Sequence, residues 1–379
     1  MTMKLFQPSF DSKLQDAILE LEHLRRIRLE GTTPAFVFFQ LKRLFHILES
    51  LGSARIEGNR TTVAQYLEAT EKNNQLGKTE QFQEVTNIDG ALKYIDESVT
   101  PDFYISHKFI RELQQLVVRG LTKEGDDHAG SYRDCQVIIT GASHTPPEPI
   151  LVQELMDDFV TFINKKDPPK YDLIKVALAH HRFGWIHPFR NGNGRTVRLL
   201  TYAMLIKYGF NVDTAGRILN PTAIFCCDRN KYYEMLSKAD NGTTEGVEAW
   251  CLYVLTGILQ ERKKLDILTD YEQVKAKILL PAVKNALQKG LISLDEEKTL
   301  EVSIRNKTVT AADVASALNI KSSAATYLLG KLREKDLIES VEQSKRRYCL
   351  KFSSSKLIYG IVDALNKHEL IPSNLLKDK

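Results

Sequence analysis

The sequence predicts an all-α protein that carries one short β-hairpin and ends in a winged-helix domain. Over most of the 379 residues, apolar side chains recur at intervals of three and four, which is the period of amphipathic helices. A β-branched run at residues 137–140, bounded by a glycine and a proline pair, predicts the hairpin. Near the C-terminal end, a helix-turn-helix pattern precedes two alternating segments.

The helices are justified in chain order by this apolar spacing. Residues 11–100 repeat it after Leu14 and again after Phe36. In the central part we expect helices over residues 105–121, 150–164, 173–185 and 195–208, and further helical segments over 247–289. We therefore predict an N-terminal helical region at 1–100, a central core at 101–265, and linker helices with a winged helix at 266–379.

The C-terminal pattern predicts helices over 311–318 and 322–335, with Ser322 or Ser323 as the N-cap of the second. Strand-like segments follow at 338–341 and 347–352. Basic residues that could contact a phosphate backbone lie in the second helix and the wing: they are Lys331, Arg333, Lys335, Lys345, Arg346 and Arg347. Acidic neighbours dilute this charge: Glu334, Asp336, Glu339 and Glu342. DNA binding and protein docking both remain open.

Composition describes an ordinary globular chain. Hydrophobic residues make up 43%, charged residues 26%, and the net charge of +4 is too small to indicate nucleic-acid binding by itself. The five cysteines form no Cys-x-x-Cys pair, which fits free thiols in a reducing compartment. Neither a signal peptide nor an apolar run of membrane-spanning length occurs. We expect a cytoplasmic protein without a membrane partner.

The most informative segment runs from residue 187 to 198 and reads His-Pro-Phe-Arg-Asn-Gly-Asn-Gly-Arg-Thr-Val-Arg. Its Asn-Gly-Asn-Gly loop can turn successive backbone N–H groups inward and leads into a helix N-terminus, which favours anions. Arg195 and Arg198 project from the first turns of that helix and suit phosphate oxygens. His187 can accept a proton near neutral pH. Together these residues predict transfer of a phosphorus-centred group from a di- or triphosphate to a nucleophile.

This segment resembles the signature of the Fic family, His-Pro-Phe-x-(Asp/Glu)-Gly-Asn-Gly-Arg-x-x-Arg. The resemblance implies a Fic-type helical core that moves AMP from ATP to a Ser, Thr or Tyr hydroxyl of a target protein, assisted by Mg²⁺. His187 would be the general base. The loop around Gly192, Asn193 and Gly194 would hold the α- and β-phosphates, Arg195 would contact the phosphates, and Arg198 would hold the γ-phosphate.

One position departs from the family pattern. The acidic residue that holds the metal in the family is Asn191 here. An amide oxygen can bind Mg²⁺ but lacks the negative charge that this hard cation favours. We therefore expect weaker metal binding and slower catalysis.

An upstream segment resembles the Fic inhibitory motif, (Ser/Thr)-x-x-x-Glu-(Gly/Asn). Here it comprises Ser53, Glu57 and Gly58, followed by Asn59. Ser53 and Glu57 are four residues apart and share a helix face, and Gly58 ends the helix. A carboxylate at Glu57 that pairs with Arg198 would withdraw the cation intended for the γ-phosphate, so the resemblance implies autoinhibition.

Two further segments acquire roles from the same resemblance. The hairpin residues Val137, Ile138, Ile139 and Thr140 would form a flap that holds the target by strand-like pairing. Tyr232, Tyr233 and Asp240 would line the base pocket, with Asn241 as a neighbour that could substitute for Asp240. His180 and His181 lack the spacing of a zinc site and are expected to pack or cap.

Two other functions remain open from the sequence. One is a different Fic activity: removal of AMP, or transfer of another nucleotide or of a phosphocholine-like group. The other is a non-catalytic regulator that binds DNA or protein, suggested by Asn191. The presence of His187, Asn193, Arg195 and Arg198 argues against the second. Self-association into a homo-oligomer and the identity of the target protein are not readable from the sequence.

Overall fold

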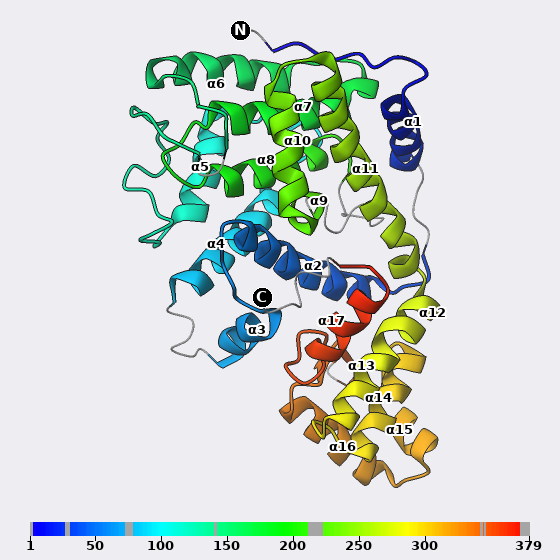
Figure 1. Cartoon of the computed structure of the whole chain (residues 1–379). Helices are drawn as coiled ribbons and strands as arrows, with labels where there is room; N and C mark the ends of the chain where they lie inside the picture. The colour runs from blue at the N-terminus through cyan, green and yellow to red at the C-terminus, as the bar shows by residue number, and fades with distance from the viewer. Residues whose placement is uncertain are drawn as a thin grey trace. The chain divides into compact units, whose positions relative to one another are not determined.

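The computed structural model describes residues 3–26, 31–72, 79–139, 142–210, 223–341, 344 and 346–371. The chain forms two compact units, which are treated separately below (Figure 1). The first comprises Met1–Arg28, Glu49–Thr61 and Gln75–Lys263, and the second comprises Leu29–Leu48, Thr62–Asn74 and Lys264–Lys379. Thr140 of the predicted flap and Lys345 and Glu342 of the predicted wing lie outside the described residues.

The first unit is built from helices, as the apolar spacing predicts. Those that lie wholly within it are α1 (Lys13–Arg26), α4 (Glu80–Ser98), α5 (His107–Val118), α6 (Pro149–Asn164), η2 (Pro169–Tyr171), α7 (Asp172–Ile186), α8 (Asn193–Lys207), α9 (Ala223–Cys227) and α10 (Arg229–Asp240). The end of α2 (Ala35–Ile56) and most of α11 (Thr244–Thr269) complete it.

The centre of this unit is α8, on which nearly every residue is buried. A helix enclosed on most sides needs a mostly apolar surface, and the run from Val197 to Ile206 is apolar apart from Tyr202 and from Arg198 and Thr201, which have polar partners. Helix α7 packs along it, with α4 and α5 on other sides. Because α7 and α8 are joined only by residues 187–192, the packing of these two helices fixes the loop that contains the signature.

The predicted flap forms a loop without a β-ladder. Among its described residues, 134–139 and 142–148, no strand is assigned. The N–H of Ala142 donates to Ile139 O at 3.1 Å. Gln136 Nε2 donates to Pro146 O at 2.9 Å and joins the two arms through a side chain. Prolines 146 and 147 lack N–H donors, which explains why a side chain rather than a ladder makes this link.

The second unit contains residues 35–48 of α2, then α3 (Val63–Lys72), α12 (Tyr271–Val274), the π-helical η3 (Lys275–Leu279), α13 (Leu280–Gln288), α14 (Leu294–Asn306), α15 (Ala311–Leu318), α16 (Ser322–Glu334) and α17 (Ile358–Lys367). Strands β1 (Ile338–Ser340) and β2 (Tyr348–Leu350) pair antiparallel, with Ile338 opposite Leu350. An isolated bridge joins Val309 to Tyr348. The predicted helix-turn-helix with a two-stranded wing is thus confirmed.

One local prediction about the winged helix was wrong. The N-cap of α16 is Lys321, without a side-chain hydrogen bond, so neither Ser322 nor Ser323 caps the helix. Two of the basic residues that could contact a phosphate backbone also lie close to the buried Glu296 of α14, and their contact with DNA stays a prediction. Glu296 Oε1 lies 2.7 Å from Lys335 Nζ and 3.5 Å from Lys331 Nζ. A buried carboxylate needs a counter-charge, and these two lysines provide it.

The domain limits differ from the predicted ones at the N-terminal end. Residues 1–100 do not form a separate unit, because α2 continues without a break and contributes residues 35–48 to one unit and 49–56 to the other. The division between Lys263 and Lys264 falls close to the predicted limit at residue 265. Within the described residues, no helix combines the length and hydropathy needed to cross a bilayer.

Candidate active site

His187 lies at the end of α7 in an unusual backbone conformation. It is the C-cap of the helix, with φ 50° and ψ 60°, and its N–H donates to Phe183 O at 2.9 Å. Its Nδ1 lies 3.3 Å from Gly184 O. Since a carbonyl can only accept, Nδ1 carries the proton and Nε2 is left as the acceptor. Burial lowers the pKa of His187 to about 4, although the contact with Gly184 raises it. The imidazole is therefore neutral at pH 7 and able to accept a proton.

The N-terminus of α8 follows five residues later. Its N-cap is Gly192, at φ 79°, and no side chain among the described residues caps it. A Cβ at Gly192 would lie 2.8 Å from Val118 Cγ1, so the turn requires glycine for both conformation and space. Asn193 is buried and braces the loop, because its Oδ1 accepts from Phe189 N and its Nδ2 donates to Phe189 O. The first N–H groups of α8 are thus open to an anion.

Arg198, one turn into α8, is buried and held by the predicted inhibitory motif. Its Nη2 lies 2.7 Å from Glu57 Oε1. Its Nε donates to Ser53 Oγ at 2.8 Å, and Nη2 also donates to Ser53 O at 3.1 Å. Helix α2 ends at Ile56, and Gly58 has φ 99°, which confirms the predicted helix end. The sequence motif therefore brings its Ser and Glu to the last arginine of the signature.

The carboxylate of Glu57 lies directly over the start of α8. A Cβ added to Gly194 would be 2.5 Å from Glu57 Oε1, so the carboxylate rests against this glycine. Burial raises the pKa of Glu57, but Arg198 outweighs that effect and holds the pKa below its usual value. Glu57 is consequently an anion at neutral pH. It occupies the position that the open N–H groups and Arg198 create for negative charge.

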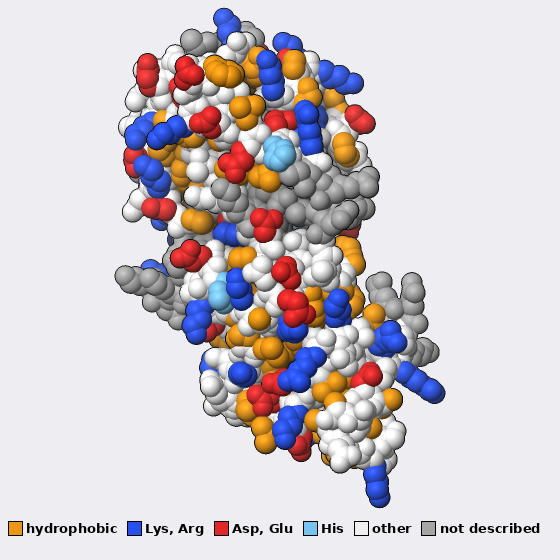
Figure 2. Space-filling model, turned by 90° about the vertical axis from the view of Figure 1, so that its right-hand side faces the viewer, with side chains coloured by type: hydrophobic (Ala, Val, Ile, Leu, Met, Phe, Trp, Pro, Cys, Tyr) orange, Lys and Arg blue, Asp and Glu red, His pale blue; other side chains and the backbone are white. Residues whose placement is uncertain are grey.

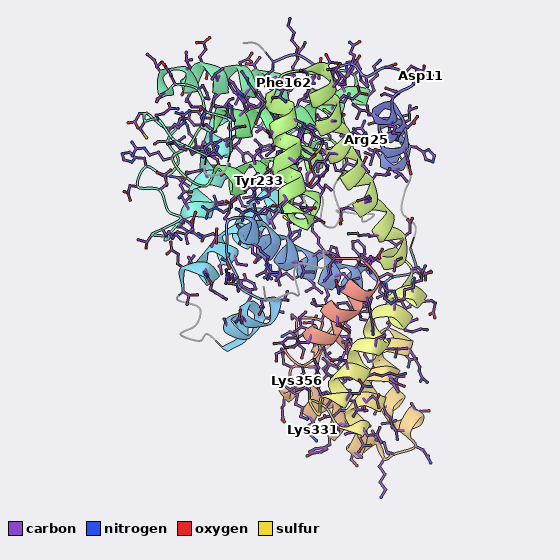
Figure 3. The ribbon with its side chains drawn as sticks, viewed as in Figure 1. Asp11, Arg25, Phe162, Tyr233, Lys331 and Lys356 are labelled. Carbon is purple, nitrogen blue, oxygen red and sulfur yellow. The ribbon has the colours of Figure 1, made fainter. Side chains whose placement is uncertain are left out.

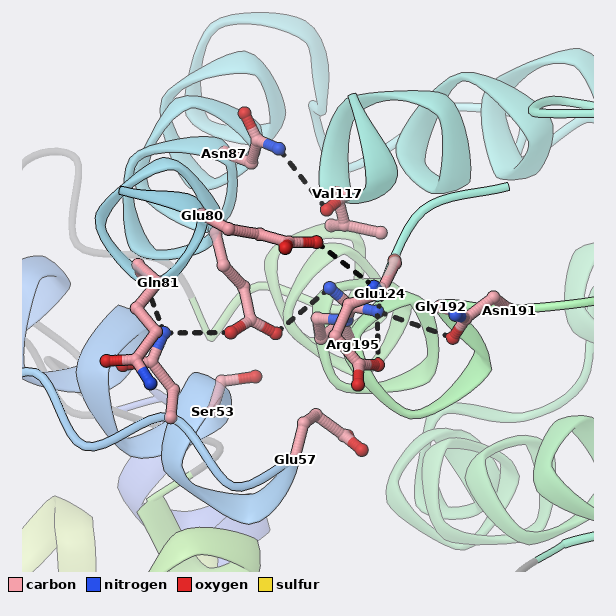
Figure 4. A network of polar contacts seen from close by, with 12 residues as sticks. Ser53, Glu57, Glu80, Gln81, Asn87, Val117, Glu124, Asn191, Gly192 and Arg195 are labelled. Carbon is pink, nitrogen blue, oxygen red and sulfur yellow. Dashed lines mark hydrogen bonds and ion pairs between the residues drawn. The ribbon is translucent and has the colours of Figure 1, made fainter. Parts of the chain in front are cut away.

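Arg195 does not point toward this position. It is buried, and its Nη1 lies 2.9 Å from Oε1 of the buried Glu84 on α4 (Figure 4). Its Nη2 donates to Glu124 O at 3.1 Å and lies 3.5 Å from Asn191 Oδ1. Glu84 Oε2 in turn accepts from Asn59 Nδ2 at 2.8 Å. The phosphate contact expected of Arg195 stays a prediction, since here the guanidinium connects α4 to the signature loop.

Asn191, at the position of the family's metal-binding acid, is engaged within its own loop. Its Oδ1 accepts from Gly192 N at 2.7 Å and from Arg195 Nη2 at 3.5 Å. Both lone pairs of this oxygen therefore have donors, and the side chain has no negative charge. Asn191 and its loop therefore do not fit a strong protein site for Mg²⁺.

The predicted base-pocket residues differ in burial: Tyr232 is buried, Asp240 is half-buried and Tyr233 is exposed. Tyr232 is buried, and its hydroxyl lies 2.8 Å from His180 Nε2. His180 is buried as well, with Nδ1 2.7 Å from Thr201 Oγ1, so it packs as predicted. Tyr233 is exposed on α10 (Figure 3). Asp240, at the end of that helix, places Oδ1 2.8 Å from His181 Nε2.

Two matches to family models agree with this geometry. The model described as "Fic/DOC family" matches residues 104–205, which span α5 to α8 and include the signature. The chain contains a Fic domain. The model described as "Winged helix DNA-binding domain" matches residues 301–355.

Individual proteins extend the similarity beyond the Fic domain. The protein adenylyltransferase Fic of Aedes aegypti is 34% identical over 202 residues, which are 52% of this chain and 37% of that protein. The protein of the same name from Drosophila yakuba is 34% identical over 242 residues, 62% of this chain and 43% of that protein. The chain therefore spans less than half the length of these curated relatives. A crystal structure of a Fic family protein from Desulfovibrio desulfuricans G20 covers 91% of this chain with a TM-score of 0.52. The match also covers 98% of that chain, and at 19% identity it shows similarity of fold alone.

Sequence reasoning missed several residues that bond to the signature segment without belonging to it. Glu84 carried a usable signal, because it lies four residues before the buried Ile88 and so shares a helix face with the core. Glu124 and Arg133 lie in loops, where periodicity carries no information. Only the folded arrangement brings Arg133 to the backbone of His187, with its Nε donating to His187 O at 2.8 Å.

Proposed function

We propose that this protein is an adenylyltransferase that moves AMP from ATP to a hydroxyl of a target protein and is autoinhibited by Glu57. The observation that carries the proposal is the anion already held at the site. Glu57 Oε1 lies 2.7 Å from Arg198 and rests on Gly194, at the open N-terminus of α8. A phosphate is favoured there for the same electrostatic reasons. The names of the curated relatives support the choice of adenylyl transfer.

The chemistry follows from the positions of these groups. Nε2 of the neutral His187 accepts the proton of the target hydroxyl, and the hydroxyl oxygen attacks the α-phosphorus of ATP. The bond from that phosphorus to the bridging oxygen of the β-phosphate breaks, and pyrophosphate leaves. Arg198 and the amides at the start of α8 would bind the leaving phosphates and stabilise the charge that develops on them. The base and the phosphate site come from two helices joined by six residues.

Inhibition in this proposal is a competition for one cation. Arg198 cannot bind a γ-phosphate and Glu57 at full strength at the same time. Ser53 keeps the guanidinium in place through two hydrogen bonds, so release of Glu57 would leave Arg198 positioned for nucleotide. The site would then switch on by a local movement of the end of α2.

The loop over residues 134–148 is the element that we assign to target binding. Ile138 is 89% exposed, which is unusual for an isoleucine and leaves an apolar side chain available to a target segment. No strand is assigned to the described residues of this loop, so an extended peptide could add to its backbone by strand-like pairing.

The proposed reaction is tested with radiolabelled nucleotide. The full chain and a Glu57→Gly variant are incubated with ATP labelled at the α- or the γ-phosphate, and separately with α-labelled GTP and UTP. Adenylyl transfer requires that protein retain the α-label and not the γ-label. Retention of the γ-label would identify a kinase, and preference for GTP or UTP would identify another nucleotidyl transfer. Release of AMP from previously labelled protein would identify the reverse activity. Each of these outcomes would overturn the proposal.

Mg²⁺ dependence gives a prediction for Asn191. In the Glu57→Gly background, Asn191→Asp should lower the Mg²⁺ concentration for half-maximal transfer severalfold. The carboxylate can still accept from Gly192 N, and it adds the charge that this hard cation favours. The measurement is the initial rate across a Mg²⁺ titration at fixed ATP. Asn306→Asp, an exposed change in the second unit, controls for added charge. Equal rates at limiting Mg²⁺ would contradict the idea.

DNA binding by the winged helix is a second proposed function. The N-terminal half of α16 exposes Ser322, Ser323, Thr326 and Tyr327, and this face contains no acidic residue. In helix-turn-helix proteins the same part of the second helix reads base edges. Exposed Arg346 and Arg347 lie in the wing. On the face drawn in Figure 2, positive and negative side chains are interspersed. We therefore expect contact with DNA to depend on few side chains.

Fluorescence anisotropy with a labelled duplex tests this second function. We expect binding that weakens as salt rises from 50 to 200 mM, and Arg346→Glu should weaken it by about tenfold and reduce the salt dependence by about one phosphate contact. Lys298→Glu, an equal charge reversal at an exposed position of α14, should change the affinity much less. Absence of salt-dependent binding, or equal losses in both variants, would refute the role.

A further inference from the structure

Arg133 is a buried cation whose partners are backbone carbonyls. Only 2% of the residue is exposed. Its Nε donates to His187 O at 2.8 Å, Nη1 to Cys135 O at 3.0 Å, and Nη2 to Pro147 O at 2.6 Å and Ile186 O at 3.3 Å. Within the described part of the chain, no carboxylate lies at ion-pair distance from it. Burial lowers the pKa of Arg133, as expected for a cation without a counter-ion.

The carbonyls that hold this cation fall into two groups. Cys135 and Pro147 belong to the two arms of the loop over residues 134–148. Ile186 and His187 end α7, where the helix dipole favours positive charge. The backbone N–H of Arg133 adds a bond to Pro188 O at 2.8 Å. From the second arm, His144 Nε2 lies 2.9 Å from Trp185 O. Three successive carbonyls at the end of α7 are therefore bound by side chains of this loop region.

This arrangement is costly unless it holds something in place. Removing a charge from water is unfavourable even where polar partners surround it. His187 itself adopts a left-handed backbone, which is sterically unfavourable for a residue other than glycine. Conformations of this kind persist only where neighbouring structure enforces them, and they cluster at functional sites. Here the enforcing contacts are those of Arg133 on both sides of the His187–Pro188 peptide.

We propose that Arg133 is a positioning residue that fixes the loop over residues 134–148 and the backbone of His187 to each other, so that a target hydroxyl held by the loop meets His187 Nε2. This inference rests on the proposed function and assigns the coupling between target binding and the base. The planar guanidinium suits the task, because its five N–H groups diverge toward carbonyls on different segments. A lysine ammonium at the same place could reach some of them but not all.

The test uses the full chain with Glu57→Gly and adds either Arg133→Lys or Arg133→Met. Transfer of α-label from ATP to the protein's own hydroxyls should fall by at least about tenfold with lysine and further with methionine. The dissociation constant for a non-hydrolysable ATP analogue should change by less than about twofold. Arg190→Lys is the matched control, since Arg190 ties the same loop from the solvent side through Asp134 at 2.5 Å. In Arg190→Lys, the transfer rate and the dissociation constant for the ATP analogue should both stay within about twofold of their values in the Glu57→Gly chain.

Two readouts do not depend on transfer and keep the inference separable from the proposed function. A nitroxide on the exposed Cys135, in a chain with Cys227→Ser, should become more mobile in Arg133→Lys. The NMR signal of the His187 ring should shift in the same variant. If the Glu57→Gly chain transfers no nucleotide, the proposed function fails while these readouts still report on Arg133. Unchanged label and ring signals in Arg133→Lys would overturn the inference. So would an equal effect of Arg190→Lys, or a parallel loss of nucleotide binding.

Discussion

Replacing Glu57 by glycine should raise AMP transfer by about 10- to 100-fold. Glu57 makes a charge-assisted hydrogen bond to Arg198 at 2.7 Å. Such a bond is worth about 1.5–3 kcal/mol, and each ~1.4 kcal/mol corresponds to a factor of ten. The substitution removes the competing carboxylate and leaves both bonds from Arg198 to Ser53. The initial rate of α-label incorporation from ATP, measured beside the parent protein, gives the ratio.

Two further variants separate charge from space at this position. Glu57→Gln keeps the size of the side chain and one hydrogen-bond acceptor but loses the charge, so we expect an intermediate rate. Arg198→Ala in the Glu57→Gly chain should return transfer to a low level, because the released cation is then missing. If parent and Glu57→Gly bind the ATP analogue and transfer AMP at the same rate, Glu57 is not inhibitory.

Replacing His187 by alanine in the active Glu57→Gly chain should lower transfer by about 10²- to 10⁴-fold, the usual contribution of a positioned general base. Nucleotide affinity should persist, because the groups assigned to the phosphates belong to α8 and not to this side chain. The pKa of His187, lowered to about 4, means that the neutral form is already present at pH 7. The measurements are the transfer rate and the dissociation constant for the ATP analogue.

The control for this variant is His23→Ala, which removes an exposed imidazole from α1 in the same unit. It should leave the rate unchanged. His187→Gln adds a second test, because it restores polarity without restoring a base and should stay as inactive as alanine. Transfer that survives both changes at His187 would exclude it as the base and redirect the search to other acceptors near the start of α8.

Much of the fold could be predicted from local pattern. The apolar spacing of residues 105–121, 150–164, 173–185 and 195–208 corresponds to α5, α6, α7 and α8 within a few residues at each end. The helix-turn-helix and its strands were predicted as well, from a short helix, a tight turn and a second helix followed by two alternating segments. Such features depend on neighbours a few residues away. In the described part of the predicted flap hairpin no strand is assigned, and the carbonyls of Cys135, Pro146 and Pro147 accept from side chains instead.

For the site, sequence alone determined which chemical groups are present and in what order. A base, a glycine loop, a helix start and an arginine are covalently adjacent between residues 187 and 198, so their proximity needs no tertiary argument. The carboxylate at Glu57 could be paired with Arg198 only through a resemblance, because 141 residues separate them.

Only the tertiary structure decided which distant partners these polar groups have. It placed Arg195 on Glu84, Tyr232 on His180 and Arg133 on the backbone of His187. In the sequence these residues are an arginine of the signature, a tyrosine of a pair and an arginine in a loop, and no local pattern shows which partner each will have. The partners follow from burial, because a polar group removed from water must pair with a group on one of the distant segments that the packing brings near.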